Sequence, residues 1–189
     1  ILASKSKVRK KILDENNIEC KVFPSNADEE LVKKSLIKEN LSPELISKNL
    51  AELKANKVSL KFNKEIVIGA DSVIDMNGEL ISKPKNRDEA LKILKKLNGK
   101  THNLISSVCI SKNGSMIWHY TDKASLTMKN MTEIELQKYL SKITDEALYA
   151  YNVYQIEGEG KSLFLKIKGD EDTIMGLPIK KIKNYLEKL

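Results

Sequence analysis

The chain has 189 residues, with 33 Lys and Arg against 26 Asp and Glu, a net charge of +7 and a hydrophobic fraction of 41%. This length suits one domain with its own core, and the apolar fraction excludes a disordered chain. Charged residues interrupt the apolar stretches far below the length of a membrane span, so no membrane partner is expected.

The composition also bears on the compartment and on charged partners. The two cysteines form neither a disulfide framework nor a metal-binding spacing, so a reducing cytoplasm is expected. Arg9 and Arg87 are the only arginines, and lysine supplies the rest of the positive charge. Sequence-specific readers of nucleic acid rely on the planar arginine fork. The charge therefore favours a solvated surface over nucleic-acid binding, and it leaves an anionic small substrate open.

Strand-like and helix-like patterns alternate along the chain, which predicts an α/β protein. In chain order the first half predicts a strand end at 1–4, a helix over 7–17, a strand at 20–23, a helix near 28–39, a helix from Ser42-Pro43, and strands at 65–75 and 79–82. The second half predicts a helix between Asn86 and Gly99, strands at 101–111 and 116–128, a helix from Thr132, a strand at 162–168, and a helix from Pro178.

The strand at 65–75 is apolar on both faces, a pattern typical of a central, covered strand. Asp71 interrupts it, and buried carboxylates without a partner are rare. If the strand ends near Gly69-Ala70, Asp71 emerges at its carboxyl end, where open α/β sheets bind ligands. There it could hold a divalent metal or take a proton from water. A carboxylate that caps a turn is the alternative.

Other segments carry chemistry-bearing side chains with an equally plain structural alternative. Residues 4–11 combine hydroxyls and cations at a helix start, which predicts either an anion site or an ordinary capped helix. Lys54 lies on a largely apolar helical face, and Lys83 follows a short strand. The acidic cluster at 28–30 suits helix capping or metal support. The Gly-punctuated loop at 154–160, with Glu157, predicts either a turn or a contact with a flat base.

Taken in order, these segments resemble the Maf family of nucleoside triphosphate pyrophosphatases over nearly the whole chain. The matching motifs are Ala3-Ser4-Lys5-Ser6-Lys7-Val8-Arg9, Asp28-Glu29, 50–55, 67–73, 78–84, 97–102, 156–160 and Gly176-Leu177-Pro178. The resemblance implies one Maf-like domain over 1–189, with an elongated mixed β-sheet flanked by helices and two lobes around a central cleft. It also implies a homodimer as a common assembly of the family.

The resemblance implies an enzyme that hydrolyses the α–β phosphoanhydride of a nucleoside triphosphate, giving the monophosphate and pyrophosphate with Mg²⁺ or Mn²⁺. Asp71 would accept the proton of the attacking water, and Glu29 and Asp71 would hold the metal. The residues that would bind the triphosphate and offset its charge are Ser4, Arg9, Lys54 and Lys83. Nucleotide-pool cleansing and division arrest are the roles suggested for the family.

The resemblance implies that base specificity depends on three positions of the family, which correspond to Val8, Ser72 and Glu157. The branch acting on dTTP and UTP carries Arg, Thr and Gln there, and the branch acting on 7-methyl-GTP carries an aromatic residue, Gln and Glu. This chain matches neither fully, although a carboxylate suits a guanine edge. A broad nucleoside triphosphate pyrophosphatase is the prediction. A 7-methyl-GTP or a dTTP/UTP subtype is the alternative.

Three departures from the family pattern affect the predicted site. Lys7-Val8 replaces Pro-Arg, Leu53 replaces the Glu before the helix lysine, and residues 149–152 replace Asp-Lys-x-Gly. Glu52 stands one position earlier than the missing Glu, and a slip of one residue turns a helical side chain by about 100°. These departures favour a second alternative, a catalytically weak module that binds nucleotides or nucleic acid.

Overall fold

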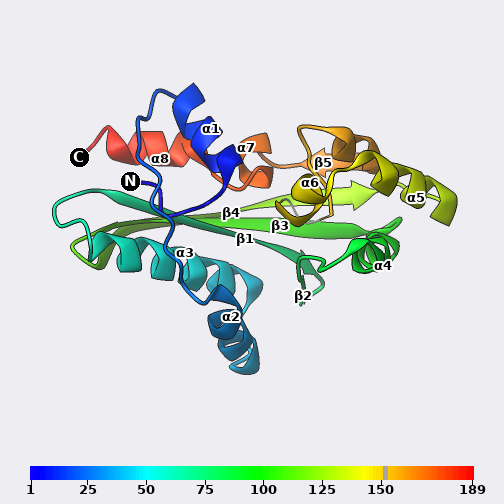
Figure 1. The fold of residues 1–189 in the computed structure, drawn as a ribbon, viewed down its shortest axis with the longest axis horizontal. Coiled ribbons are helices and arrows are strands. Elements are labelled where there is room, and N and C mark those ends of the chain that lie inside the picture. Colours follow the sequence, from blue (N-terminus) through cyan, green and yellow to red (C-terminus); the bar gives the residue numbers. More distant parts are fainter. Residues whose placement is uncertain (151–152) are drawn as a thin grey trace.

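A computed structural model describes residues 1–150 and 153–189 (Figure 1). The helices in these ranges are α1 (Lys7–Glu15), α2 (Glu29–Lys38), α3 (Pro43–Ser59), α4 (Arg87–Leu97), α5 (Glu133–Lys142), α6 (Asp145–Ala150), the 3₁₀ helix η1 (Glu159–Leu163), α7 (Glu171–Ile174) and α8 (Ile179–Leu186). The strands are β1 (Val67–Met76), β2 (Glu79–Ile81), β3 (Thr101–Lys112), β4 (Ser115–Met128) and β5 (Phe164–Lys168). The predicted α/β class is confirmed.

The strands form one sheet in the order β2-β1-β3-β4-β5, with each neighbouring pair antiparallel. Leu2 adds isolated parallel bridges to Val22 and to Ile68 of β1, so pairing is mixed at this edge. The predicted strands at 1–4 and 20–23 are therefore wrong in extent, because each contributes only a single bridge. Tight turns join β1 to β2 at Asn77-Gly78 and β3 to β4 at Asn113-Gly114, and all four residues have positive φ.

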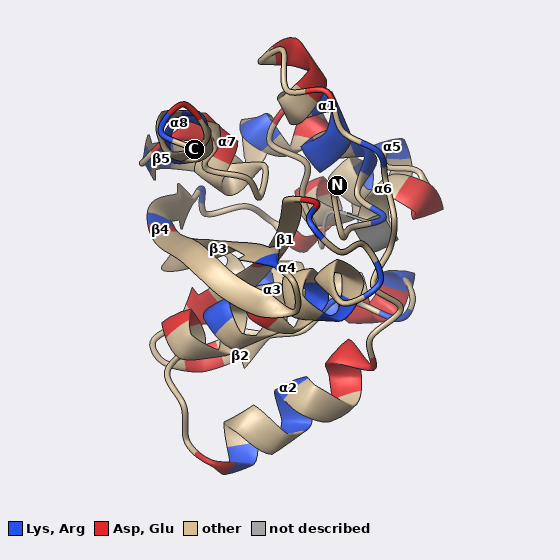
Figure 2. Ribbon diagram, turned by 90° about the vertical axis from the view of Figure 1, so that its left-hand side faces the viewer, with Lys and Arg blue, Asp and Glu red and all other residues tan. Residues whose placement is uncertain are grey.

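Helices cover both faces of the sheet (Figure 1). On one face lie α1, α7 and α8, while α3 packs on the other face with α2 beyond it, away from the sheet (Figures 1 and 2). Basic and acidic residues both occur on α1, α2 and α3 (Figure 2). The described residues include no helix with the length and apolar character that a bilayer crossing needs.

The core is divided along the length of the sheet into two main clusters. One cluster surrounds the later half of β1 and includes Ile74 with side chains of α4 and α5. The other surrounds the beginning of β1 and includes Ala70, Leu2 and side chains of α1 and α8. Asp71 and Ser72 occupy the short polar stretch of β1 between Ala70 and Ile74. The fold thus places polar side chains where the two clusters meet.

Three further predictions need correction. The strand carrying Asp71 does not end near Gly69-Ala70, because β1 continues to Met76. The rule that ligands bind at carboxyl ends applies to open parallel sheets, and this sheet is antiparallel. The last strand begins at Phe164, since the preceding residues form η1. The short helices α6 and α7 were not predicted, and the single domain over 1–189 stays a prediction.

Candidate active site

A buried ion pair joins the middle of β1 to α3. Asp71 and Lys54 are 8% and 5% exposed, and Lys54 Nζ lies 2.8 Å from Asp71 Oδ1. The same ammonium donates to the carbonyl of Ala70 at 3.3 Å. Burial of either charge alone would be unfavourable, so the pairing explains how a carboxylate and a lysine coexist here. The unusual placement of both residues in the sequence therefore has one cause.

Lys54 reaches Asp71 because α3 packs very closely on β1. A Cβ at Gly69 would lie 2.3 Å from the Ala51 carbonyl oxygen and 2.8 Å from the Ala55 Cβ. Only glycine fits at such a distance, and alanines on the helix provide the matching small surface. The Gly-Ala-Asp of the strand and the Ala-x-x-Lys-Ala of the helix are thus two halves of one contact.

A second carboxylate meets the same ammonium from α2. Glu29 Oε2 lies 2.7 Å from Lys54 Nζ, and its side chain is 47% exposed. Glu29 opens α2, which Asp28 caps by accepting from the backbone N–H of Leu31. Glu29 and Asp71 are oxygen donors of the kind that Mg²⁺ prefers. Among the described residues, no group of three or more His, Cys, Asp or Glu is placed to hold a metal.

Arg9 binds the opposite side of this segment of β1. Its Nη1 donates to the Ala70 carbonyl at 2.9 Å and to Ser4 Oγ at 3.2 Å. Its Nη2 donates to Ser72 Oγ at 3.1 Å, and its Nε to the Gly176 carbonyl at 2.9 Å. The predicted site residues Ser4, Arg9 and Ser72 are therefore in one hydrogen-bonded group. Arg9 and Lys54 share the Ala70 carbonyl, which connects this group to the ion pair.

The two cations lie in a gap along the outer edge of β1. On that edge, Leu2 pairs with Ile68, and β2 begins to pair only at Ile74. Between these positions the Ala70 carbonyl accepts from side chains, whereas on the other edge β3 pairs with β1 without interruption. An interrupted strand edge thus exposes backbone acceptors to cations, and the cations make this gap suitable for an anion.

Lys83 belongs to the same electrostatic neighbourhood. Desolvation lowers the pKa of Lys83, followed by the positive charge of Arg9, and Lys54 acts in the same direction. Asp71 and Glu29 oppose the shift. Lys83 is an exposed residue, and the surrounding protein nevertheless desolvates its ammonium. Burial likewise lowers the pKa of Arg9, against the attraction of Asp71 and Glu29. Three cations therefore crowd around two carboxylates.

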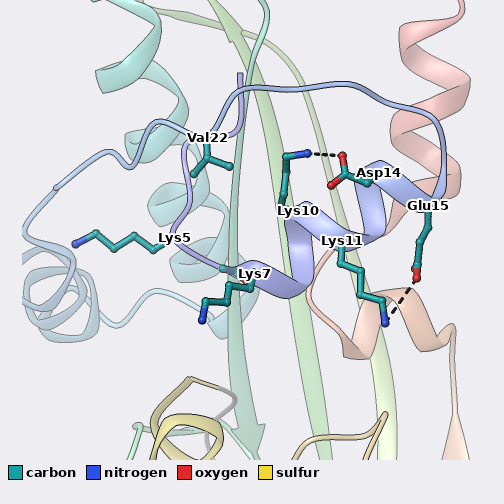
Figure 3. A pocket seen from close by; sticks show the side chains of 8 residues that line it. Lys5, Lys7, Lys10, Lys11, Asp14, Glu15 and Val22 are labelled. Atoms are coloured by element: carbon teal, nitrogen blue, oxygen red, sulfur yellow. Dashed lines mark hydrogen bonds and ion pairs between the residues drawn. The ribbon is translucent and has the colours of Figure 1, made fainter.

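The segment at 4–11 forms a helix cap and also lines a pocket on α1. Ser6 caps α1 by accepting from the backbone N–H of Arg9 at 3.3 Å, which confirms the capped helix. A pocket of about 360 Å³ lies along the outer side of α1, with Lys10 paired to Asp14 and Lys11 to Glu15 (Figure 3). The residues lining it are Lys5, Ser6, Lys7, Lys10, Lys11, Asp14, Glu15 and Val22. The pocket contains none of the residues around Asp71.

The three predicted specificity residues are not brought together by contacts in this structure. Val8 is buried in the cluster that contains Leu2, whereas Ser72 is half-buried beside Arg9. Glu157 is exposed and accepts from Gln155 Nε2 at 3.2 Å. Packing against Gln155 explains the glycine at position 160, since a Cβ there would lie 2.6 Å from the Gln155 carbonyl oxygen. The code at these positions stays a prediction.

Two of the departures from the family pattern lie at Leu53 and at 149–152. Glu52 accepts from Asn56 Nδ2 at 3.4 Å, and its carboxylate is not among the two described groups that pair with Lys54. It therefore does not replace the Glu missing at Leu53. Of the departure at 149–152, Tyr151 and Asn152 lie outside the described residues.

The sequence reasoning missed a buried polar network behind Ser72. Ser72 Oγ lies 2.8 Å from Ser106 Oγ, which donates to the Thr173 carbonyl at 2.7 Å. On the other face, Ser47 donates to the Asp71 carbonyl at 3.0 Å. The one signal for this network was Ser106-Ser107, a polar pair inside an otherwise apolar strand. Thr173 and Ser47 gave no signal, because their partners are distant in sequence.

The chain is similar to known proteins over its whole length. The model of the Maf-like protein family matches residues 1–189. A protein of Pelagibacter ubique named nucleoside triphosphate pyrophosphatase is 73% identical over 187 residues, covering 99% of this chain and 96% of that one. A protein of Rhizobium etli named 7-methyl-GTP pyrophosphatase is 35% identical over 189 residues, covering 100% and 95%. The Staphylococcus aureus Ham1 structure aligns over 99% and 97% with a TM-score of 0.45 and 15% identity, a likeness too distant to define the fold.

Proposed function

The chain belongs to the Maf-like protein family, and from this premise we propose that it is a nucleoside triphosphate pyrophosphatase. The enzyme hydrolyses the α–β phosphoanhydride and releases a nucleoside monophosphate and pyrophosphate. The observation that carries the proposal is the buried pair of Asp71 and Lys54 in the interrupted edge of β1. A carboxylate beside several cations is the combination that water attack on a polyphosphate requires.

Asp71 takes the proton of the attacking water. As the water oxygen forms its bond to phosphorus, the anhydride bond breaks and pyrophosphate leaves with the bonding electron pair. Lys54 orients the carboxylate through its 2.8 Å contact and offsets charge that builds up on the phosphate oxygens. Positioning and charge neutralisation are the main requirements of phosphoryl chemistry, so these two groups carry the reaction.

Ser4, Lys54 and Lys83 hold the triphosphate. Ser4 Oγ accepts from the Ser6 backbone and from Arg9, and no acceptor among the described residues takes its hydroxyl proton. That proton is available for a phosphate oxygen. Lys83 is exposed beside the buried charges, so its ammonium can meet a ligand that enters from solvent. The charge of Arg9 adds to the attraction for the polyanion.

Glu29 and Asp71 are the residues that would hold a divalent cation, Mg²⁺ or Mn²⁺. Their carboxylates already converge on one positive charge, the Lys54 ammonium, and they supply the oxygen ligands that such ions prefer. When bound, the ion would neutralise negative charge on the phosphates.

The broad activity on nucleoside triphosphates is favoured by the relative that is 73% identical and carries that name. Preference for 7-methyl-GTP is the second candidate, because Glu157 is a carboxylate suited to a guanine edge and a relative 35% identical carries the corresponding name. The two cysteines, which form no disulfide framework, support a cytoplasmic location, and the family resemblance supports a homodimer. The scarcity of arginine, with Arg9 and Arg87 as the only two, argues against nucleic acid as a partner.

The test is pyrophosphate release from a panel of normal and modified triphosphates with Mg²⁺ or Mn²⁺. Asp71→Asn is expected to abolish turnover. Asp75→Asn is the matched control, because Asp75 lies on the same strand with 9% exposure but binds the Gly78 backbone and Asn103 instead. Turnover by Asp71→Asn at the wild-type rate would refute the mechanism. Salt-dependent binding of oligonucleotides without any turnover would support the module that binds but does not catalyse.

A further inference from the structure

The guanidinium of Arg9 is almost completely occupied by the protein. An arginine side chain has five N–H donors, and four of those of Arg9 are directed to Gly176, Ser4, Ala70 and Ser72. A phosphate oxygen could replace these acceptors only if several hydrogen bonds were broken. Arg9 thus differs from Lys83, which is an exposed residue.

Two of the four acceptors flank the reacting carboxylate in sequence. Ala70 and Ser72 are the neighbours of Asp71 on β1, and successive side chains of a strand point to opposite faces. Arg9 therefore holds the Ala70 carbonyl on one side of Asp71 and the Ser72 hydroxyl on the other, while Lys54 holds the Asp71 carboxylate from α3. The position of the carboxylate depends on both attachments.

The orientation of the Ser72 hydroxyl follows from proton counting. Ser106 has a single hydroxyl proton and donates it to the Thr173 carbonyl at 2.7 Å. Ser72 must therefore donate to Ser106 across 2.8 Å and accept from Arg9. Thr173 in turn donates through its own hydroxyl to Asp122 at 2.6 Å. The network thus runs in one direction, from Arg9 through β1 and β3 to α7 and β4.

Gly176 completes the enclosure of the guanidinium. Its φ of +93° lies in the region that favours glycine, and a Cβ there would lie 3.0 Å from Ser72 Oγ and 3.3 Å from Arg9 Nη2. A side chain at this position would press on Arg9 and on Ser72 together. The glycine is therefore tied to the arginine contact, although 167 positions separate the two in sequence.

We propose that Arg9 is a positioning residue, which with Gly176 fixes the segment of β1 around Asp71 and acts on the reaction without contacting the substrate. This inference rests on the proposed function and assigns Arg9 a role different from triphosphate binding. Lysine cannot replace it, because one ammonium cannot reach acceptors on three separate segments in the way that the planar fork does.

The experiment compares Arg9→Lys and Gly176→Ala, with two readouts: kcat for triphosphate hydrolysis and the affinity for inorganic pyrophosphate measured by calorimetry. Both variants are expected to lower kcat by about 100-fold, the size of effect that displacement of a reacting group produces, and to bind pyrophosphate within about twofold of the wild type. The double variant should fall little further than either single one. Lys83→Met is the positive control and should lose pyrophosphate affinity.

Arg87→Lys is the matched control for loss of an arginine. Arg87 donates to the Leu140 and Ile143 carbonyls and pairs with Asp145, away from Asp71, so kcat should not change. Thermal unfolding checks that each variant is folded. Loss of pyrophosphate affinity in Arg9→Lys but not in Gly176→Ala, or full activity of Gly176→Ala, would overturn the inference alone. A wild-type protein without turnover would overturn the proposed function as well.

Discussion

The ammonium of Lys54 lies 2.8 Å from Oδ1 of Asp71, and both residues are more than nine-tenths buried. Loss of either residue has a different effect on the charges that remain. Without Lys54, both Asp71 and Glu29 lose the ammonium that pairs with them, whereas without Asp71, Lys54 keeps its contacts with Glu29 and the Ala70 carbonyl.

Lys54→Met should therefore destabilise the protein more than Asp71→Asn does. The lysine variant removes the cation that pairs with the buried carboxylate, which costs about 3–5 kcal/mol, while the asparagine variant removes the charge that needed a partner. Urea unfolding at pH 7 measures the free energy of unfolding of each variant. Both should lose turnover. Equal stability of the two variants would show that solvent reaches Asp71.

Glu29→Gln should weaken Mn²⁺ binding by about tenfold, equivalent to about 1.4 kcal/mol, because the ion loses one of two carboxylate charges. Titration followed by electron paramagnetic resonance measures the free ion directly and needs no turnover. Glu30→Gln is the control, since Glu30 points to Lys34 at 3.6 Å on the same helix. A similar loss of affinity in both variants would contradict the assignment of Glu29.

As the pH increases, the KM for the triphosphate should begin to rise at a lower pH than the deprotonation of an unperturbed lysine would produce. Desolvation and the charge of Arg9 lower the pKa of Lys83 from its usual 10.5, so the ammonium loses its proton, and its attraction for phosphate, at a lower pH. Steady-state kinetics between pH 7.5 and 10.5 measure the rise. Lys83→Arg keeps its charge and should flatten the profile. An unchanged profile in that variant would exclude Lys83 as the titrating group.

His102 should make folding less stable in mild acid. Burial lowers its pKa from 6.5 to about 4, and its Nε2 lies 2.9 Å from the Tyr154 hydroxyl. Between these pH values the unfolded chain binds the proton and the folded chain does not, so stability falls as the pH falls from 6.5 to 4. The difference corresponds to about 3 kcal/mol.

Unfolding of the wild type and of His102→Gln, measured at pH 7 and at pH 4.5, tests this contribution. The glutamine can keep a hydrogen bond to Tyr154 but does not titrate. The wild type should lose more stability than the variant over this interval. Identical losses would mean that other groups dominate the acid sensitivity.

Glu157→Gln should shift substrate preference away from guanine nucleotides. The carboxylate only accepts hydrogen bonds and suits the donor groups of a guanine edge, while an amide can also donate to a uracil carbonyl. The ratio of kcat/KM for 7-methyl-GTP to that for UTP measures the change and should fall. Glu159→Gln, two residues further on, is the control because Glu159 pairs with Lys142. A fall in both variants would point to general electrostatics.

Much of the fold could be predicted from local pattern. The Asn77-Gly78 turn has φ values of 55° and 87°, as its residue types require, and the helix predicted from Thr132 begins there with a capping box to Glu135. Residues 1–4 lacked such information, because a single bridge from Leu2 leaves no periodic pattern. Short helices such as α7 are equally hard to predict, since their stability depends on tertiary contacts.

The site shows the same division. Asp71 and Lys54 could be singled out because each is a charge in an apolar context, and Gly69 marks the close approach that joins them. The bond between Arg9 and Gly176 could not be inferred, because no local rule relates residues on separate segments. The predicted strand at 65–75 is confirmed by β1, so the conditional reading in which it ends before Asp71 does not hold. Whether a strand continues past a carboxylate depends on the partner that neutralises it.

The attachment of α2 has a consequence for turnover. No residue of α2 is buried, and its first residue, Glu29, reaches inward to Lys54. One of the two acidic groups of the site is thus carried by a helix that few apolar contacts restrain. The other acidic group is fixed on β1, which pairs with β3 without interruption. Ligand entry and release can therefore proceed through movement of one surface helix, while the strand that holds Asp71 stays in register.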